Sequence, residues 1–89
     1  MAITQGTVVV GTVATLIHRS TSNGCTVHIF CGSGGQDVTL GNGSVVASAG
    51  YIMPATKATE VDVTVPPGDS LYGITATNTQ TLYVLKVEY

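Results

Sequence analysis

The sequence predicts an all-β protein, a small antiparallel β-sandwich of jelly-roll or Greek-key type with roughly seven or eight short strands. Short runs rich in β-branched residues alternate with clusters of Gly, Pro, Asn and Ser at intervals of roughly 8–12 residues, which is typical of sandwiches and barrels. The sequence has no helical period and no repeat. With 89 residues the chain is long enough for one domain, so we expect residues 1–89 to form a single β-sandwich domain.

Each expected strand is a run of apolar or alternating residues between two turn-forming clusters. The runs are residues 7–10, 13–19, 25–30, 37–40, 44–47, 59–65, 71–76 and 81–88. Residues 1–6 have no pattern of their own, and we expect a flexible N-terminal arm, or one that becomes ordered by strand pairing with a partner. The dipeptide Asn-Gly favours hairpins because both residues accept φ > 0, and it occurs at residues 23–24 and 42–43.

The first Asn-Gly pair predicts a hairpin between residues 13–19 and 25–30. If its loop has an even length and no bulge interrupts the strands, the side chains alternate between two faces. The core face would then carry Ala14, Leu16, His18, Cys25, Val27, Ile29 and Cys31. The outer face would carry Thr15, Ile17, Arg19, Thr26, His28 and Phe30.

The two long runs near the C-terminus differ in their alternation. In residues 59–65 every second residue is Val and polar residues lie between, so one face is apolar. Residues 81–88 are apolar on both faces, so we expect this strand to be covered on both sides, the second cover being another subunit or a second sheet. The candidate subunit or partner interface consists of Ile17, Phe30, Tyr83, Leu85, Val87 and Tyr89.

The composition excludes two classes of partner. Charged residues make up 9% of the chain and the net charge is −2, whereas an average domain has about 25% charged residues. With 3 Lys and Arg residues the chain has no basic stripe, so we expect no nucleic-acid partner. No apolar run approaches about 18 residues and the start of the chain lacks the features of a signal peptide, so we expect no membrane association.

Residues 68–71 read Gly-Asp-Ser-Leu, the four-letter signature of the GDSL esterases and lipases, in which the Ser is the nucleophile. In that family the motif lies near the start of the chain, and the Asp and His of the triad follow it. Here Ser70 lies late in the chain and both histidines precede it. Because a Ser without a base is a poor nucleophile, we expect a turn instead, with Gly68 at φ > 0 and Asp69 or Ser70 bonding nearby backbone N–H groups.

No other pattern predicts chemistry. His18 and His28 would project to opposite faces of the hairpin, and the sequence has no CxxC or HxxxH spacing, so we expect no metal site. Cys25 and Cys31 would lie ~20 Å apart in one extended strand, too far for a disulfide, and we expect buried thiols formed in a reducing cytoplasm. The stretch CGSGGQ lacks the ending of a phosphate-binding loop. We therefore expect no catalytic residue, no cofactor and no enzyme activity.

From Gly11 onward the chain contains a Thr-rich hairpin, the strand-turn-strand DVTLGNGSVV, then ASAGYIM, PPGDSLYGITA and a final TLYVLKV. This order of features resembles the small β-sandwich virion proteins of tailed bacteriophages, of the capsid-decoration or minor-capsid type. The resemblance implies a homo-oligomer, with a trimer favoured, that binds the outside of the capsid and cements neighbouring subunits of the major capsid protein. It also implies assembly in the bacterial cytoplasm and a final location on the virion exterior.

In this role residues 1–6 would be a capsid-contacting arm. The alternative is a phage tail, fibre or host-surface β-sandwich module that binds glycans, because similar modules occur in tail and fibre proteins. A surface of Thr, Ser, Asn, Gln and Gly suits either burial in an assembly or contact with sugar.

Overall fold

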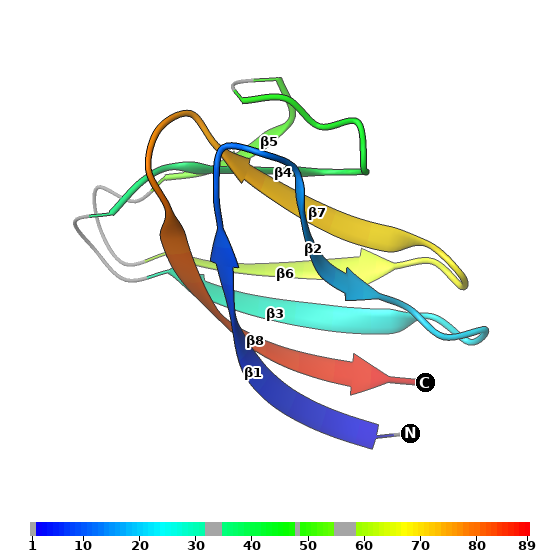
Figure 1. The fold of residues 1–89 in the computed structure, drawn as a ribbon. Coiled ribbons are helices and arrows are strands. Elements are labelled where there is room, and N and C mark those ends of the chain that lie inside the picture. The colour runs from blue at the N-terminus through cyan, green and yellow to red at the C-terminus, as the bar shows by residue number, and fades with distance from the viewer. Residues whose placement is uncertain (1, 32–34, 48, 55–58) are drawn as a thin grey trace.

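The computed structural model describes residues 2–31, 35–47, 49–54 and 59–89. Over these residues the protein is all-β, with eight strands in two antiparallel four-stranded sheets that pack face to face (Figure 1). The predicted β-sandwich is confirmed. Residues 32–34 of the predicted Gly-rich loop and residue 1 of the predicted arm lie outside the described residues.

Sheet A has the spatial order β1-β8-β3-β6 and consists of β1 (Ala2–Val10), β8 (Gln80–Glu88), β3 (Cys25–Cys31) and β6 (Thr59–Val65). Sheet B has the order β2-β7-β4-β5 and consists of β2 (Thr15–Arg19), β7 (Ser70–Thr75), β4 (Val38–Gly41) and β5 (Tyr51–Met53). Successive strands change sheet at every connection except the one between β4 and β5, which is the jelly-roll arrangement. In Figure 1 sheet A is the lower layer, and both termini lie at the same end of it.

The core fills the space between the sheets because each inner strand alternates in burial. In β3 every second residue, from Cys25 to Cys31, is buried. The core also contains Leu82 and Val84 from β8 of sheet A and Met53 from β5 of sheet B. Fully burying each large apolar side chain contributes about 1.5–3 kcal/mol. Both cysteines are buried and neither is in a disulfide bond, as predicted.

The predicted hairpin between residues 13–19 and 25–30 is wrong. Strand β2 pairs with β7 in sheet B, whereas β3 pairs with β6 and β8 in sheet A. Residues 20–24 therefore cross from one sheet to the other, and Gly24 has a φ of 82° at the end of this crossing. Asn-Gly supplies a turn conformation, but which strands pair is decided by the apolar faces that come together.

Two residues of β2, Leu16 and Ile17, do not lie on the predicted faces. The β2–β7 register shifts between Leu16 and His18, so that β2 carries one extra residue at a β-bulge. As a result Ile17 is 4% exposed and belongs to the core, while Leu16 is 47% exposed. The prediction that Ile17 is part of an interface is therefore wrong, because the bulge interrupts the strict alternation on which it depended.

The N-terminal segment is a strand of the sandwich over residues 2–6, not the predicted arm. β1 pairs with β8 from Ala2 opposite Glu88 to Val10 opposite Gln80. Residues 44–47 do not form the predicted strand, because a turn from Asn42 to Val45 leads only to an isolated bridge between Val46 and Ala49. The short strand β5 follows and had not been predicted.

Candidate functional site

The outer face of sheet A is the candidate functional surface. Here the register places Ile3 opposite Val87 and Tyr83 opposite Phe30, so side chains of β1, β8 and β3 form one surface. The exposed fraction is 66% for Ile3, in the edge strand β1, and 52% for Tyr83, in the inner strand β8, so both apolar side chains are largely open to solvent. We call this surface the sheet A face, and it consists of Ile3, Phe30, Tyr83, Leu85, Val87 and Tyr89.

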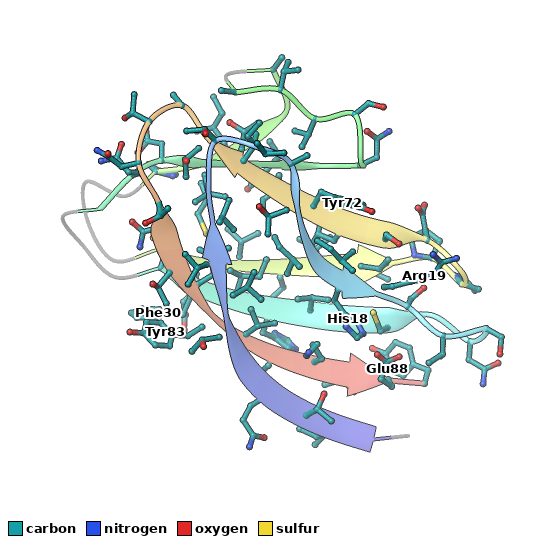
Figure 2. All side chains as sticks on the ribbon, viewed as in Figure 1. His18, Arg19, Phe30, Tyr72, Tyr83 and Glu88 are labelled. Atoms are coloured by element: carbon teal, nitrogen blue, oxygen red, sulfur yellow. The ribbon has the colours of Figure 1, made fainter. Side chains whose placement is uncertain are left out.

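An open groove of ≈ 700 Å³ runs over this surface, and residues of β1, β3, β6 and β8 line it. The rings of Phe30 and Tyr83 contact each other there, with centroids 6.3 Å apart and planes tilted by 40°. Figure 2 shows these two rings together on one side of the molecule. A ring pair of this kind gives an exposed surface a rigid apolar contact area.

Polar groups border the groove along β6. The Nδ1 atom of His28 is 2.6 Å from Oδ1 of Asp62, and Glu60 lies on the same edge. At the end of β8, the hydroxyl of Tyr89 is hydrogen-bonded to Oγ1 of Thr26 at 2.5 Å. The surface thus combines an apolar part over β1 and β8 with a more polar, acidic border over β6.

The structure brings five of the six predicted interface residues onto this face and places the sixth, Ile17, in the core. Sequence reasoning missed Ile3 because residues 1–6 were treated as an arm. Residues 2–6 show no alternation of apolar and polar side chains, so no local signal in the sequence marked this strand. That these residues contact a partner stays a prediction.

The turn containing the Gly-Asp-Ser-Leu motif matches the predicted geometry. Gly68 has a φ of 75°, and Oδ1 of Asp69 accepts a hydrogen bond of 2.8 Å from the backbone N–H of Ser70. The N–H of Gly68 donates to the carbonyl of Thr21, which ties the turn to the crossing between β2 and β3. Ser70 begins β7 opposite Arg19. The prediction of a Gly68-centred turn is confirmed, while the absence of enzyme activity stays a prediction.

A second group of ionisable side chains lies at the end of the sandwich. The imidazole Nε2 of His18 contacts Oε1 of Glu88, and Figure 2 shows the two side chains facing each other. The hydrogen bond from His18 holds the pKa of the Glu88 carboxyl below its ordinary value, against the opposite effect of partial burial. Burial, followed by the charge of Glu88, raises the pKa of the Cys25 thiol. This group was not predicted from the sequence.

Comparison with known proteins gives a likeness of fold. No family model matches the chain, and the search of curated proteins found no match. A solved structure from Bacillus endospore appendages, described as a novel family of disulfide-linked pili, is similar with a TM-score of 0.51 and 17% sequence identity. The similarity covers 94% of this chain and 84% of that one. Within the described residues, no helix has the length and apolar character needed to cross a membrane.

Proposed function

We propose that the protein is a structural subunit that packs its sheet A face against other protein subunits in a large assembly. The exposed apolar side chains gathered on this face carry the proposal. Contiguous apolar surface on a soluble domain marks an interaction site when it is large. The low charge of the chain also favours contacts that change little with salt.

In the leading form of this proposal, the protein binds the outside of a phage capsid as a homo-oligomer, with a trimer favoured. The order of strands and turns that resembles phage decoration proteins supports it. Each copy would bury surface across neighbouring subunits of the major capsid protein. A ligand that binds only the assembled state stabilises that state by mass action, so the bound protein would raise the free energy of capsid disassembly.

A second form of the proposal is a subunit of a surface filament, which the fold similarity to the spore-appendage protein favours. Those appendages are described as disulfide-linked. In this chain Cys25 and Cys31 are both 0% exposed, so we expect its contacts with other subunits to be non-covalent. The glycan-binding alternative is supported by the groove, in which an aromatic pair lies beside the polar groups of His28 and Asp62.

The test is a pair of charge substitutions on opposite faces of the sandwich. Leu85→Asp places a carboxylate in the sheet A face, where Leu85 is 42% exposed. Leu16→Asp places one on the outside of sheet B, where Leu16 is 47% exposed, and serves as the matched control. Binding is measured by co-sedimentation with undecorated phage heads, and the oligomeric state by light scattering on a sizing column.

If the proposal holds, Leu85→Asp binds heads at least tenfold more weakly, about 1.4 kcal/mol, and Leu16→Asp binds as the unmodified chain does. Equal binding by both variants would remove the sheet A face from the proposal. If the purified chain forms filaments, and Leu85→Asp but not Leu16→Asp prevents them, the result would favour the filament form of the proposal. Failure of the unmodified chain to bind heads or to self-associate, together with glycan binding blocked by Tyr83→Ala, would select the alternative.

A further inference from the structure

Three residues with metal-binding side chains meet at the end of the sandwich where β2 passes over sheet A. Cys25 and Glu88 are directly opposite each other in the β3–β8 ladder, so their side chains lie on the same face of sheet A. Because Cys25 is 0% exposed, that face is the interior one. The bulge in β2 lets His18 point across from sheet B toward the same place.

The three donor atoms are close enough to bind one ion. The ligand atoms of His18, Cys25 and Glu88 all lie within 4.8 Å of one another. Donors around one zinc ion lie roughly 3–4 Å apart, given zinc–ligand distances of about 2.0–2.3 Å, so small side-chain rotations would complete the geometry. The side chains of His18 and Glu88 are 18% and 17% exposed, which leaves a path for an ion from solvent.

The Glu88 carboxyl group has unused capacity at this site. One of its oxygens, Oε1, contacts Nε2 of His18. The other oxygen, Oε2, is buried and has no hydrogen-bond partner among the described residues. A buried carboxylate oxygen without a partner is unfavourable, and a cation would satisfy it.

We propose that His18, Cys25 and Glu88 form a binding site for one divalent transition-metal ion of the zinc class. An imidazole nitrogen, a thiolate sulfur and a carboxylate oxygen are the donors that zinc uses in proteins. The thiolate and imidazole disfavour calcium and magnesium, which prefer oxygen donors. On binding, the Cys25 thiol releases its proton to solvent and the sulfur coordinates the metal. With three protein ligands, the fourth position is left for water.

Such an ion would join the two sheets. His18 belongs to sheet B, whereas Cys25 and Glu88 belong to sheet A. The three ligands are separated along the chain, so no short motif such as CxxC announces the site. Because the ion binds the folded chain and not the separated sheets, it stabilises the fold by mass action. The metal site is separate from the sheet A face, and the proposal of a metal site does not depend on the proposed docking function.

The test is titration of the chelator-treated full chain with cobalt(II), which has an absorption spectrum and takes the same ligands as zinc. We expect one equivalent to bind, with a thiolate-to-cobalt charge-transfer band in the near ultraviolet, and zinc to displace it. Zinc should raise the midpoint of thermal unfolding by about 5 °C or more. Cys25→Ser should remove the band, while Cys31→Ser, the matched control in the same strand, should keep it.

His18→Gln and Glu88→Gln test the other two ligands, which are largely but not fully buried. Each substitution should weaken zinc binding at least tenfold. His28→Gln, at the other histidine–carboxylate pair, should leave binding unchanged. Circular dichroism of the metal-free variants checks that each one is folded, and if Cys25→Ser is not, the two Gln variants decide. A saturated cobalt complex without a charge-transfer band, or zinc affinity unchanged in both Gln variants, would overturn the proposal.

Discussion

Replacing Ile17 by Ala should destabilise the fold far more than replacing its neighbour Leu16, although simple alternation along the strand predicts the reverse. Ile17 is 4% exposed and Leu16 is 47% exposed. Replacing a buried Ile by Ala lowers the free energy of unfolding by about 2–5 kcal/mol, because apolar burial is lost and a cavity is left behind. An exposed position such as Leu16 should cost about 1 kcal/mol or less.

The contact between Ile17 and β7 gives a second, independent measure of the same geometry. A Cβ added to Gly73 would lie 3.1 Å from Cδ1 of Ile17 and 3.1 Å from Cγ1 of Val38. Gly73→Ala should therefore overpack the core by about 1–3 kcal/mol. In a chain that already carries Ile17→Ala, one of these contacts is gone, and the penalty should be smaller by about 0.5 kcal/mol or more.

Guanidinium denaturation of the three single variants and of the Ile17→Ala/Gly73→Ala double variant measures these free energies of unfolding, and Ile17→Ala should lower the midpoint by about 1 M. Leu16→Ala supplies the neighbouring-residue control. The reasoning fails if Leu16→Ala is as destabilising as Ile17→Ala. It also fails if Gly73→Ala has the same cost in both backgrounds, since Ile17 would then not lie against β7.

Three further predictions follow from the turns and the buried thiols. Gly24→Ala should destabilise the protein more than Gly68→Ala, and denaturation measures the difference. Both glycines have positive φ. A Cβ on Gly24 would lie 3.1 Å from the carbonyl oxygen of Val65, whereas a Cβ on Gly68 would have nothing within 4 Å. The φ strain alone is worth about 1–2 kcal/mol, and an equal loss at both positions would contradict the contact. Burial, with the charge of Asp37 adding to it, raises the pKa of the Cys31 thiol above 9.0. The folded state then holds this proton more tightly than the unfolded state, so its contribution to stability is present below pH 9.0 and is lost as the pH rises above it. Denaturation at pH values on both sides of 9.0 measures this, and Cys31→Ala should make the dependence smaller. Ser70→Ala should cost about 1 kcal/mol or less, and a serine-directed active-site probe should leave Ser70 unlabelled; stoichiometric labelling would refute the turn-only role.

The fold class was predictable because it depends on local signals. The signals came from neighbouring positions: the alternation in residues 59–65 and the two apolar faces of residues 81–88. Both segments are strands of sheet A. The turn at Gly68 was predictable for the same reason, since two prolines and a glycine restrict the backbone locally. The burial of both cysteines followed from the alternation within one strand.

The candidate surfaces were predictable only in part. Phe30, Tyr83 and Leu85 were placed correctly because the alternation in β3 and β8 is unbroken. The prediction for Ile17 failed because the bulge between Leu16 and His18 interrupts the alternation, so that Ile17 lies in the core and Leu16 outside it, and nothing in the local sequence marks the bulge. Ile3 was missed because a strand of modest apolar character is recognised only beside the strand it pairs with.

By itself, the sequence determined that the chain is all-β, that its turns lie at the Gly and Pro clusters, and that one strand has two apolar faces. These are consequences of backbone preferences and of the two-residue period of a strand, which act over a few residues. Only the tertiary structure decided that β2 and β3 lie in different sheets, that β1 covers the edge of β8, and that His18 meets Cys25 and Glu88. Strand pairing and the packing of one sheet on the other are set by the joint burial of distant apolar faces, a free energy that no short segment of the chain contains.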